Sequence, residues 1–223
     1  MPLVTLLPHL LPYVLFLLLG LAGAHLPDPY GPLMEPFRAV AVLGVLFWFH
    51  RRGAYPELAR KPSPVRHATL LAIGAGLAVG LAWPVLTSAV PTLGEMGRGQ
   101  FDANALGSQW AWLLLGGRLV ASIVAVPFAE ELLVRSLIPR FADAVEGDWR
   151  DLPVGRFTPL SFAVSLGFFT LTHPEWLAAL LTGLLWMFLL TKTGRLRDLV
   201  VSHAVANAVL DAYVLASGDV SLW

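Results

Sequence analysis

Long apolar stretches run through most of this 223-residue sequence, and they limit what the chain can fold into. Hydrophobic residues make up 57% of the chain and charged residues 13%, whereas an ordinary soluble domain carries about 25% charged residues. So little charge cannot cover the surface of a water-soluble domain of this size. A membrane-spanning helix needs roughly 20 mostly apolar residues, and several segments reach or approach that length. They are residues 8–24, 33–49, 68–90, 109–130, 158–173, 175–191 and 198–217.

This pattern predicts an all-α fold, a polytopic transmembrane helical bundle of about seven spans. Residues 1–223 are expected to form a single integral membrane domain, because neither an internal repeat nor a composition change marks a boundary. The segment 33–49 is a weaker candidate because charged residues stand at its start, and 158–173 is short. The chain has no cysteine, which excludes disulfides, thiolate metal sites and a cysteine nucleophile.

The basic residues predict the orientation of the bundle. Three alternate loops, 50–67, 135–157 and 191–198, hold 12 of the 15 Lys and Arg residues. Because cytoplasmic loops carry the excess of Lys and Arg, this places the N-terminus inside and the C-terminus outside. Basic and acidic residues balance at 15 each, which argues against a nucleic-acid partner held by a basic face.

Ionisable residues inside apolar segments are costly, and the first such cluster is Glu130, Glu131 and Arg135. Glu131 and Arg135 are four residues apart and share a helix face, which favours an ion pair. Glu130 points about 100° away from Glu131, so it is free to face elsewhere, for example a cavity. A desolvated glutamate is a suitable general base or acid. The alternative interpretation is a charged helix end that reaches for the membrane interface.

The second cluster contains His173, which is followed by Pro174. Because proline disfavours helix at the preceding residue, His173 is expected at a break where its ring can be aimed. The simpler interpretation is a polar turn between two spans. The other histidines, at positions 9, 25, 50 and 67, lie near span ends or in loops and are interpreted as interfacial.

The third cluster is a polar stripe in the last apolar segment, where His203, Asn207 and Asp211 recur every four residues. Such a stripe is either a catalytic face or an interhelical hydrogen-bond seam. Asp211 lies two helical turns from His203, which places it at the margin of any site built around that histidine.

In chain order the clusters form the pattern EExxxR, FxxxH and HxxxN, carried by Glu130-Glu131…Arg135, Phe169…His173 and His203…Asn207. This pattern resembles the CAAX prenyl endopeptidase and bacteriocin-processing family (CPBP, or Abi) of intramembrane proteases. The resemblance covers about residues 109–217, the expected catalytic core. The final segment SHAVANAVLDAYVLASG resembles, more narrowly, the CAAX-protease-related branch associated with exosortase-type protein sorting.

The resemblance implies a polar intramembrane cavity in which Glu130 and His173 activate a water that attacks the scissile carbonyl. His203 and Asn207 would stabilise the oxyanion, and no cofactor is implied. The expected substrate is a lipidated or membrane-anchored protein with a C-terminal processing signal, in a bacterial cytoplasmic membrane whose lipid is the other partner.

Glu131 and Arg135 would orient the motif helix in this scheme. The chain departs from the family pattern beside the motif arginine, where Val134 and Ser136 replace an aromatic residue and a glycine. This departure leaves the catalytic set intact and bears on the subfamily and substrate.

Three alternatives stay open at this point. Glu130, His173 and His203 could hold Zn²⁺ as a His₂Glu set, although the chain has no HExxH motif. The chain could also be a non-catalytic scaffold or immunity protein of the same fold, or a small transporter.

The predicted topology places His173 at the outer end of its span, whereas Glu130 lies toward the cytoplasm. Their convergence requires a shallow hairpin, or a deeper position of Glu130 than hydropathy indicates.

Overall fold

The computed structural model describes residues 3–27, 29–59, 63–94 and 101–223, and these residues form helices and no strand. The α-helices are α1 (Leu7–Ala24), α2 (Met34–Arg51), α3 (Ala68–Ala89), α4 (Ala111–Val120), α5 (Val126–Glu131), α6 (Ile138–Asp143), α7 (Pro159–Leu171), α8 (Trp176–Thr193) and α9 (Leu196–Ser217). Two π-helical segments, Ala121–Ala125 and Leu132–Leu137, join α4, α5 and α6 into one continuous rod.

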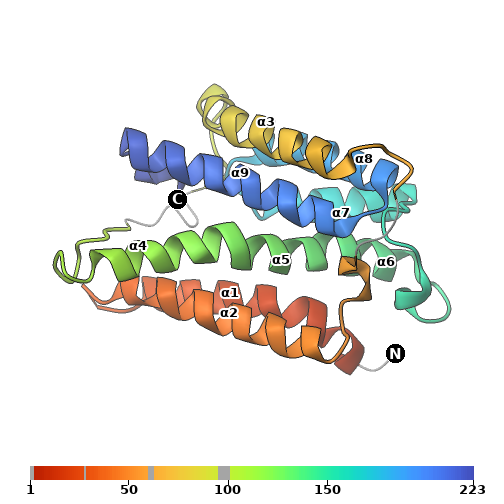
Figure 1. Cartoon of the computed structure of the whole chain (residues 1–223), viewed down its shortest axis with the longest axis horizontal. Coiled ribbons are helices and arrows are strands. Elements are labelled where there is room, and N and C mark those ends of the chain that lie inside the picture. The colour runs from red at the N-terminus through yellow and green to blue at the C-terminus, as the bar shows by residue number, and fades with distance from the viewer. Residues whose placement is uncertain (1–2, 28, 60–62, 95–100) are drawn as a thin grey trace.

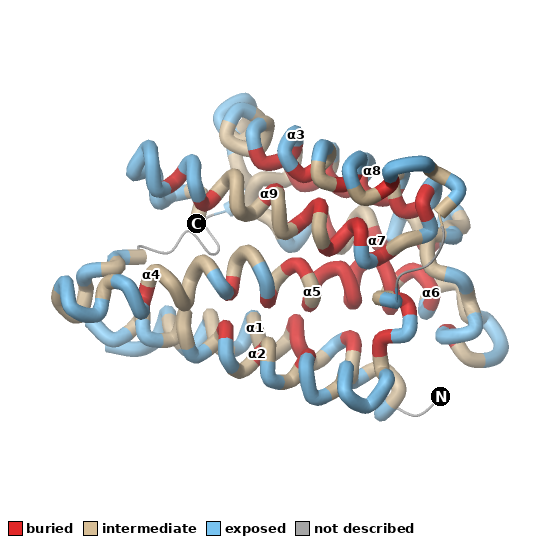
Figure 2. Tube along the Cα trace, in the orientation of Figure 1, coloured by how far each residue is buried: buried red, intermediate tan, exposed pale blue. Residues whose placement is uncertain are grey.

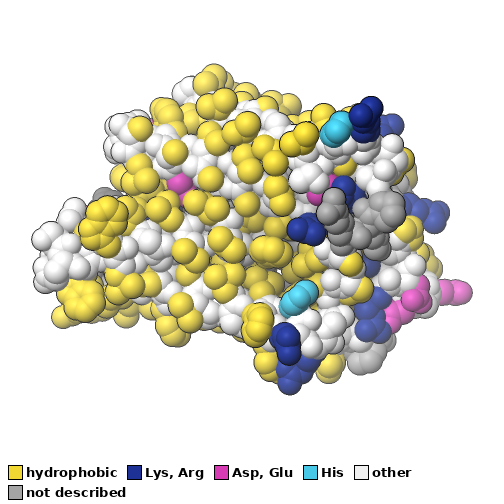
Figure 3. Space-filling model, viewed as in Figure 1, with side chains coloured by type: hydrophobic (Ala, Val, Ile, Leu, Met, Phe, Trp, Pro, Cys, Tyr) yellow, Lys and Arg dark blue, Asp and Glu magenta, His cyan; other side chains and the backbone are white. Residues whose placement is uncertain are grey.

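Six of these helical units are long and apolar enough to cross a membrane, and α7, with 13 residues, is shorter. Apolar side chains are spread over the middle of the face seen in Figure 3, and many large apolar residues are exposed, as expected for a surface that faces lipid. The all-α, multi-span prediction is therefore confirmed, with the short fifth segment standing below the length of a full span.

The rod of α4, α5 and α6 lies at the centre of the bundle (Figure 1). Helices α1 and α2 pack on one side of it, whereas α9 and α7 pack on the other, with α3 and α8 next to them. Buried residues are concentrated in the second half of the rod and on the facing sides of α9, α8 and α3 (Figure 2).

The predicted end of the fourth span at residue 130 is wrong. The helical rod continues from Ala111 to Asp143, a run of 33 residues. Hydropathy ends the span early because Glu130, Glu131 and Arg135 are charged. Inside the bundle Glu131 pairs with Arg135, and the helix passes through all three residues without a break. At about 1.5 Å per residue, Glu130 lies about 29 Å from one end of the rod and about 20 Å from the other.

Helices α3 and α9 pack closely because two glycines of α3 face the backbone of α9. A Cβ atom at Gly80 would lie 2.7 Å from the carbonyl oxygen of Ala206, and one at Gly76 would overlap the carbonyl of Ser202. Gly74, by contrast, faces open space. A small-residue face thus brings α9, which carries two motif residues, close to α3.

We expect Gly76→Ala to destabilise the protein by about 1–3 kcal/mol, because the added methyl group must push α9 away. The matched variant Gly74→Ala adds the same methyl group where nothing lies within 4 Å, and it should be neutral or slightly stabilising. Melting temperatures of the two variants in detergent test this. Equal melting temperatures would contradict the close packing of α3 on α9.

Basic side chains gather at the end of the bundle where α1 begins, on the right in Figure 3, and this end is called the basic end below. The positive-inside rule predicts that this end faces the cytoplasm, and the orientation of the bundle in the membrane stays a prediction. Three of the 15 basic residues, Arg60, Lys61 and Arg98, lie outside the described residues.

His9 lies near the start of α1 at the basic end, but it is buried in a polar cluster and not exposed there. Its Nε2 atom lies 2.7 Å from Oε1 of Glu57, which also accepts hydrogen bonds from Ser136 and from Arg140 Nη2 at 2.9 Å. The cluster connects α1 and the loop after α2 to the central rod. Hydropathy gives no sign of it, because the partners are far apart in the sequence.

The pH dependence of stability should report this cluster. Burial alone would raise the pKa of Glu57, but the hydrogen bond from His9, the hydrogen bond from Ser136 and the charge of Arg140 lower it to about 2. Glu57 therefore stabilises the fold fully above pH about 4.5, its unfolded value, and this contribution of about 3 kcal/mol is lost as pH falls toward 2.

Melting curves between pH 7 and pH 2 for the wild type and Glu57→Gln measure this contribution. The variant should be less stable at pH 7 and should lack this part of the acid sensitivity. An identical pH dependence in the two proteins would show that Glu57 does not carry it.

Candidate active site

Glu131 forms the centre of a buried charged group in the middle of the rod. Its Oε2 atom lies 3.6 Å from Nε of Arg135, and its Oε1 accepts a hydrogen bond of 2.9 Å from Nδ1 of His203. Glu131 is fully buried and Arg135 is 1% exposed. The predicted ion pair is therefore present, and it extends to a residue of α9.

Aromatic rings enclose the guanidinium group of Arg135. Its Cζ atom lies 4.0 Å from the ring centroid of Phe169 and 5.6 Å from that of Trp186. Such cation–π contacts contribute about 2 kcal/mol when they are desolvated. They let the arginine remain charged in an apolar region and explain the phenylalanine of the FxxxH motif.

Glu130 points to a different partner, His173. Its Oε2 atom lies 4.0 Å from Nε2 of the imidazole, which is beyond direct hydrogen-bond distance. This Oε2 atom is buried and has no hydrogen-bond partner among the described residues. The structure thus brings together the two residues that the motifs single out.

The orientation of His173 follows from a backbone hydrogen bond. Its Nδ1 atom donates to the carbonyl oxygen of Phe169 at 2.7 Å, so Nδ1 carries the proton. In the neutral ring, Nε2 is then unprotonated and faces Glu130. The rings of Phe169 and Trp83 pack against the imidazole, with centroids at 4.5 and 5.9 Å, and hold it in place.

The short helix α7 brings His173 to this depth. It begins at a capping box in which Thr158 and Ser161 bond each other, and both hydroxyl groups also donate to Asp143 at the end of the rod. Thirteen residues span only about 20 Å, so α7 ends inside the bundle. The predicted topology placed Glu130 and His173 at different depths. In the structure they meet because Glu130 lies deep in the rod and α7 does not reach the outer end of the bundle.

Asn207 also contacts the rod. Its Nδ2 atom donates a hydrogen bond of 2.8 Å to the carbonyl oxygen of Ser122, within the first π-helical segment. A π-helical turn leaves a carbonyl without its usual partner, and here a side chain from α9 satisfies it. The second π-helical segment is satisfied in the same way, by Ser165 Oγ donating to Val134.

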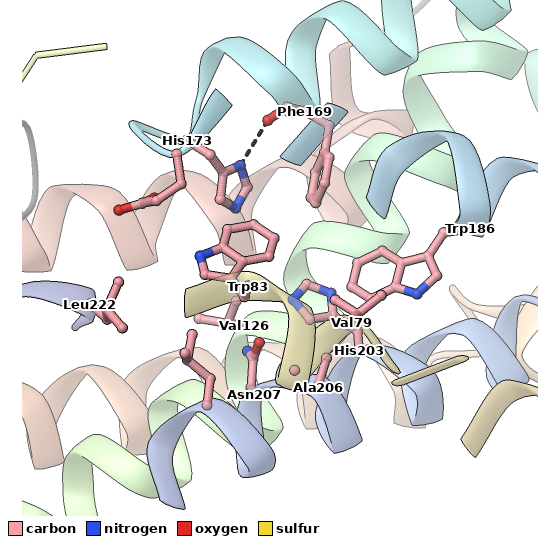
Figure 4. Close-up of a pocket in the computed structure, with 13 residues that line it drawn as sticks. Val79, Trp83, Val126, Phe169, His173, Trp186, His203, Ala206, Asn207 and Leu222 are labelled. Atoms are coloured by element: carbon pink, nitrogen blue, oxygen red, sulfur yellow. Dashed lines mark hydrogen bonds between the residues drawn. The ribbon is translucent and has the colours of Figure 1, made fainter. Parts of the chain in front are cut away.

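A cavity of about 160 Å³ lies beside these residues (Figure 4). Four polar residues line it, His173, Glu175, His203 and Asn207, among mainly apolar ones. Glu130 does not line the cavity, and its carboxylate reaches Nε2 of His173 instead. A polar cavity that Glu130 faces directly therefore remains a prediction.

Asp211 is the last residue of the polar stripe in α9. It accepts a hydrogen bond from Nε1 of Trp223 and takes no part in the charged group around Glu131. Among the described residues, no set of three His, Asp or Glu side chains is placed to hold a metal ion. The Glu131 carboxylate is already engaged by Arg135 and His203.

The sequence patterns missed Trp186, which packs on the site from α8. Its ring centroid lies 4.6 Å from that of His203, and its Nε1 atom donates to Ser202 Oγ at 3.1 Å. Tryptophans in membrane proteins are most frequent near the interfaces. The central position of Trp186 in its apolar segment was the available sign that it serves a buried polar site.

With this geometry in view, residues 108–209 match the family model described as type II CAAX prenyl endopeptidase, Rce1-like. This part of the chain is similar to the Rce1-like family. The match contains all three motifs and confirms the family that they predicted. It supports a peptidase that acts on a membrane-associated protein substrate. The comparisons with curated proteins and with solved structures gave no significant match.

Proposed function

We propose that the protein is an intramembrane endopeptidase that hydrolyses a peptide bond near the C-terminus of a lipidated or membrane-anchored protein. The observation that carries the proposal is the distance of 4.0 Å between Glu130 Oε2 and Nε2 of His173. Two hydrogen bonds of about 2.8 Å from one water can bridge atoms at this separation. Both atoms are free to accept from that water, because Glu130 Oε2 has no other partner among the described residues and Nδ1 carries the proton of His173.

In the proposed reaction Glu130 takes a proton from the shared water, and the oxygen attacks the scissile carbonyl carbon. The carbonyl oxygen becomes an oxyanion in the tetrahedral intermediate. The C–N bond then breaks, and the proton held by Glu130 passes to the leaving amine. His173 orients the water through Nε2. A positioned base of this kind contributes about 10²–10⁴-fold to the rate.

His203 and Asn207 are proposed to stabilise the oxyanion from the cavity wall. Asn207 has a second N–H that its bond to Ser122 does not use. His203 presents Nε2 on the side of the ring opposite its bond to Glu131, and it donates from there when it is protonated. Donors held in place before the reaction often make the largest electrostatic contribution.

Glu131 and Arg135 are proposed as positioning residues. Their ion pair, buried among the rings of α7 and α8, keeps adjacent Glu130 turned toward His173. The protein is proposed to lie in a bacterial cytoplasmic membrane, with the basic end on the cytoplasmic side. The narrower similarity to the exosortase-associated branch remains a prediction.

We propose that the reaction needs no metal, since Glu130, His173 and His203 do not converge on one point. Treatment of the purified protein with EDTA or 1,10-phenanthroline should leave the cleavage rate unchanged. Loss of activity that added Zn²⁺ restores would establish the zinc-dependent alternative instead.

The function is tested by comparing the termini of cellular proteins by mass spectrometry of membrane and secreted fractions. Cells carrying the wild type and cells carrying Glu130→Gln are compared, with a deletion strain as reference. Uncut C-terminal tails that appear in both the variant and the deletion strain would identify the substrate. A defect in the deletion strain alone would overturn the proposal in favour of a scaffold or immunity protein.

A further inference from the structure

Residues 218–223 fold back along α9 and return to the site. The backbone of Gly218 is left-handed, with φ +74°, and its N–H bonds the carbonyl of Val214 at 2.8 Å. A 3₁₀ turn, Val220–Leu222, follows, with Asp219 accepting hydrogen bonds from Ser221. The left-handed glycine ends the helix and reverses the chain, as it commonly does.

Trp223 holds this segment in place. Its Nε1 atom donates to Oδ1 of Asp211 at 2.8 Å, and the Asp211 side chain is buried. The guanidinium carbon of Arg118 lies 4.9 Å from the ring centroid of Trp223, and Phe101 meets the ring edge-on at 5.4 Å. Contacts from three separate parts of the chain therefore position the residue next to Leu222.

Leu222 lies between two hollow regions. It lines the cavity that contains His173 and His203, and in Figure 4 it stands at the opposite side of the view from Trp186. It also lines a groove of about 810 Å³ between α3 and α9, at the ends away from the basic end. Gly80 is the other residue that lines both regions.

We propose that Leu222 is a specificity-determining gate between this groove and the cavity, and that Trp223 is its anchor. A peptide segment that enters from the groove must pass Leu222 to bring its scissile bond to His173. The space that Leu222 leaves limits the size of the side chains beside the cleaved bond. The specificity role of Leu222 rests on the proposed function, whereas the gate itself does not.

The absence of cysteine allows a test of the gate that is independent of activity. A single cysteine, Val126→Cys, is introduced in the cavity wall of the full-length protein. Its rate of modification by methyl methanethiosulfonate in detergent is measured with Leu222 or with Leu222→Ala. The rate should rise about tenfold, because removing three carbons of a half-buried side chain lowers the cost of opening.

A matched control is Leu181→Cys, whose side chain is on the exposed face of α8. Its modification rate should not change when Leu222 is replaced. Trp223→Phe is a second variant, which keeps a ring beside Arg118 but lacks the donor to Asp211. It should also accelerate modification at position 126. An unchanged rate at position 126 in both variants, or an equal rise at position 181, would overturn the gate.

The specificity is tested on the termini of the cellular proteins described above. Leu222→Ala should yield cleaved termini with bulkier residues beside the cut, whereas Leu222→Trp should restrict them to smaller ones. The same set of cut sites in all three proteins would overturn the specificity role. The two failures are distinct, because continued cleavage by Glu130→Gln refutes the proposed function and leaves the thiol result unaffected.

Discussion

Replacement of Glu130 by Gln is expected to lower the cleavage rate by about 10²–10⁴-fold while leaving the fold unchanged. Glutamine has the same shape but cannot accept the proton of the attacking water. Because Oε2 of Glu130 makes no hydrogen bond among the described residues, its loss should cost little stability. The rate is measured with the purified protein and the substrate that terminal mass spectrometry identifies.

Two further carboxylate variants make this result specific. Glu146→Gln changes an exposed residue in the loop after α6 and should retain full activity. Glu131→Gln removes the carboxylate that binds Arg135 and His203, and it should lower stability as well as activity. A variant set in which Glu130→Gln stays active and folded Glu131→Gln is inactive would assign the base to Glu131.

Replacement of Arg135 by Met is expected to destabilise the protein by about 3–5 kcal/mol, because it leaves the Glu131 carboxylate buried without its main cation. The side chain also loses its contact with the ring of Phe169, 4.0 Å away. The melting temperature in detergent measures the effect. Activity should fall in parallel, since the pair positions adjacent Glu130.

The double variant Glu131→Gln with Arg135→Met is the informative comparison. It removes both charges, so it should be more stable than Arg135→Met alone. Arg150→Met, on an exposed ion pair with Asp148, should change the melting temperature little. A wild-type melting temperature for Arg135→Met would show that the pair does not hold the rod in place.

The sequence predicted most of the fold because apolar length is a local property. The helices α1, α2, α3, α8 and α9 lie close to the segments expected from about 20 apolar residues each. The pairing of Glu131 with Arg135 was also predictable, since four residues are one turn of a helix. The end of the fourth span was not predictable, because a hydropathy scale assigns a charged residue the same unfavourable value whether or not it is paired inside the bundle.

The site, like the fold, was only partly predictable from the sequence. The sequence by itself determined a multi-span helical protein and a motif set of Glu130, His173, His203 and Asn207. Only the tertiary structure decided that Glu130 and His173 lie 4.0 Å apart, because this depends on the length of the rod and on the depth at which α7 ends. It also decided the places of Trp186 and Leu222, whose partners are distant in sequence. A membrane span can be predicted from the free energy of transferring each of its residues from water into the membrane. A site depends on contacts between helices that are distant in sequence, and a local sequence pattern does not contain them.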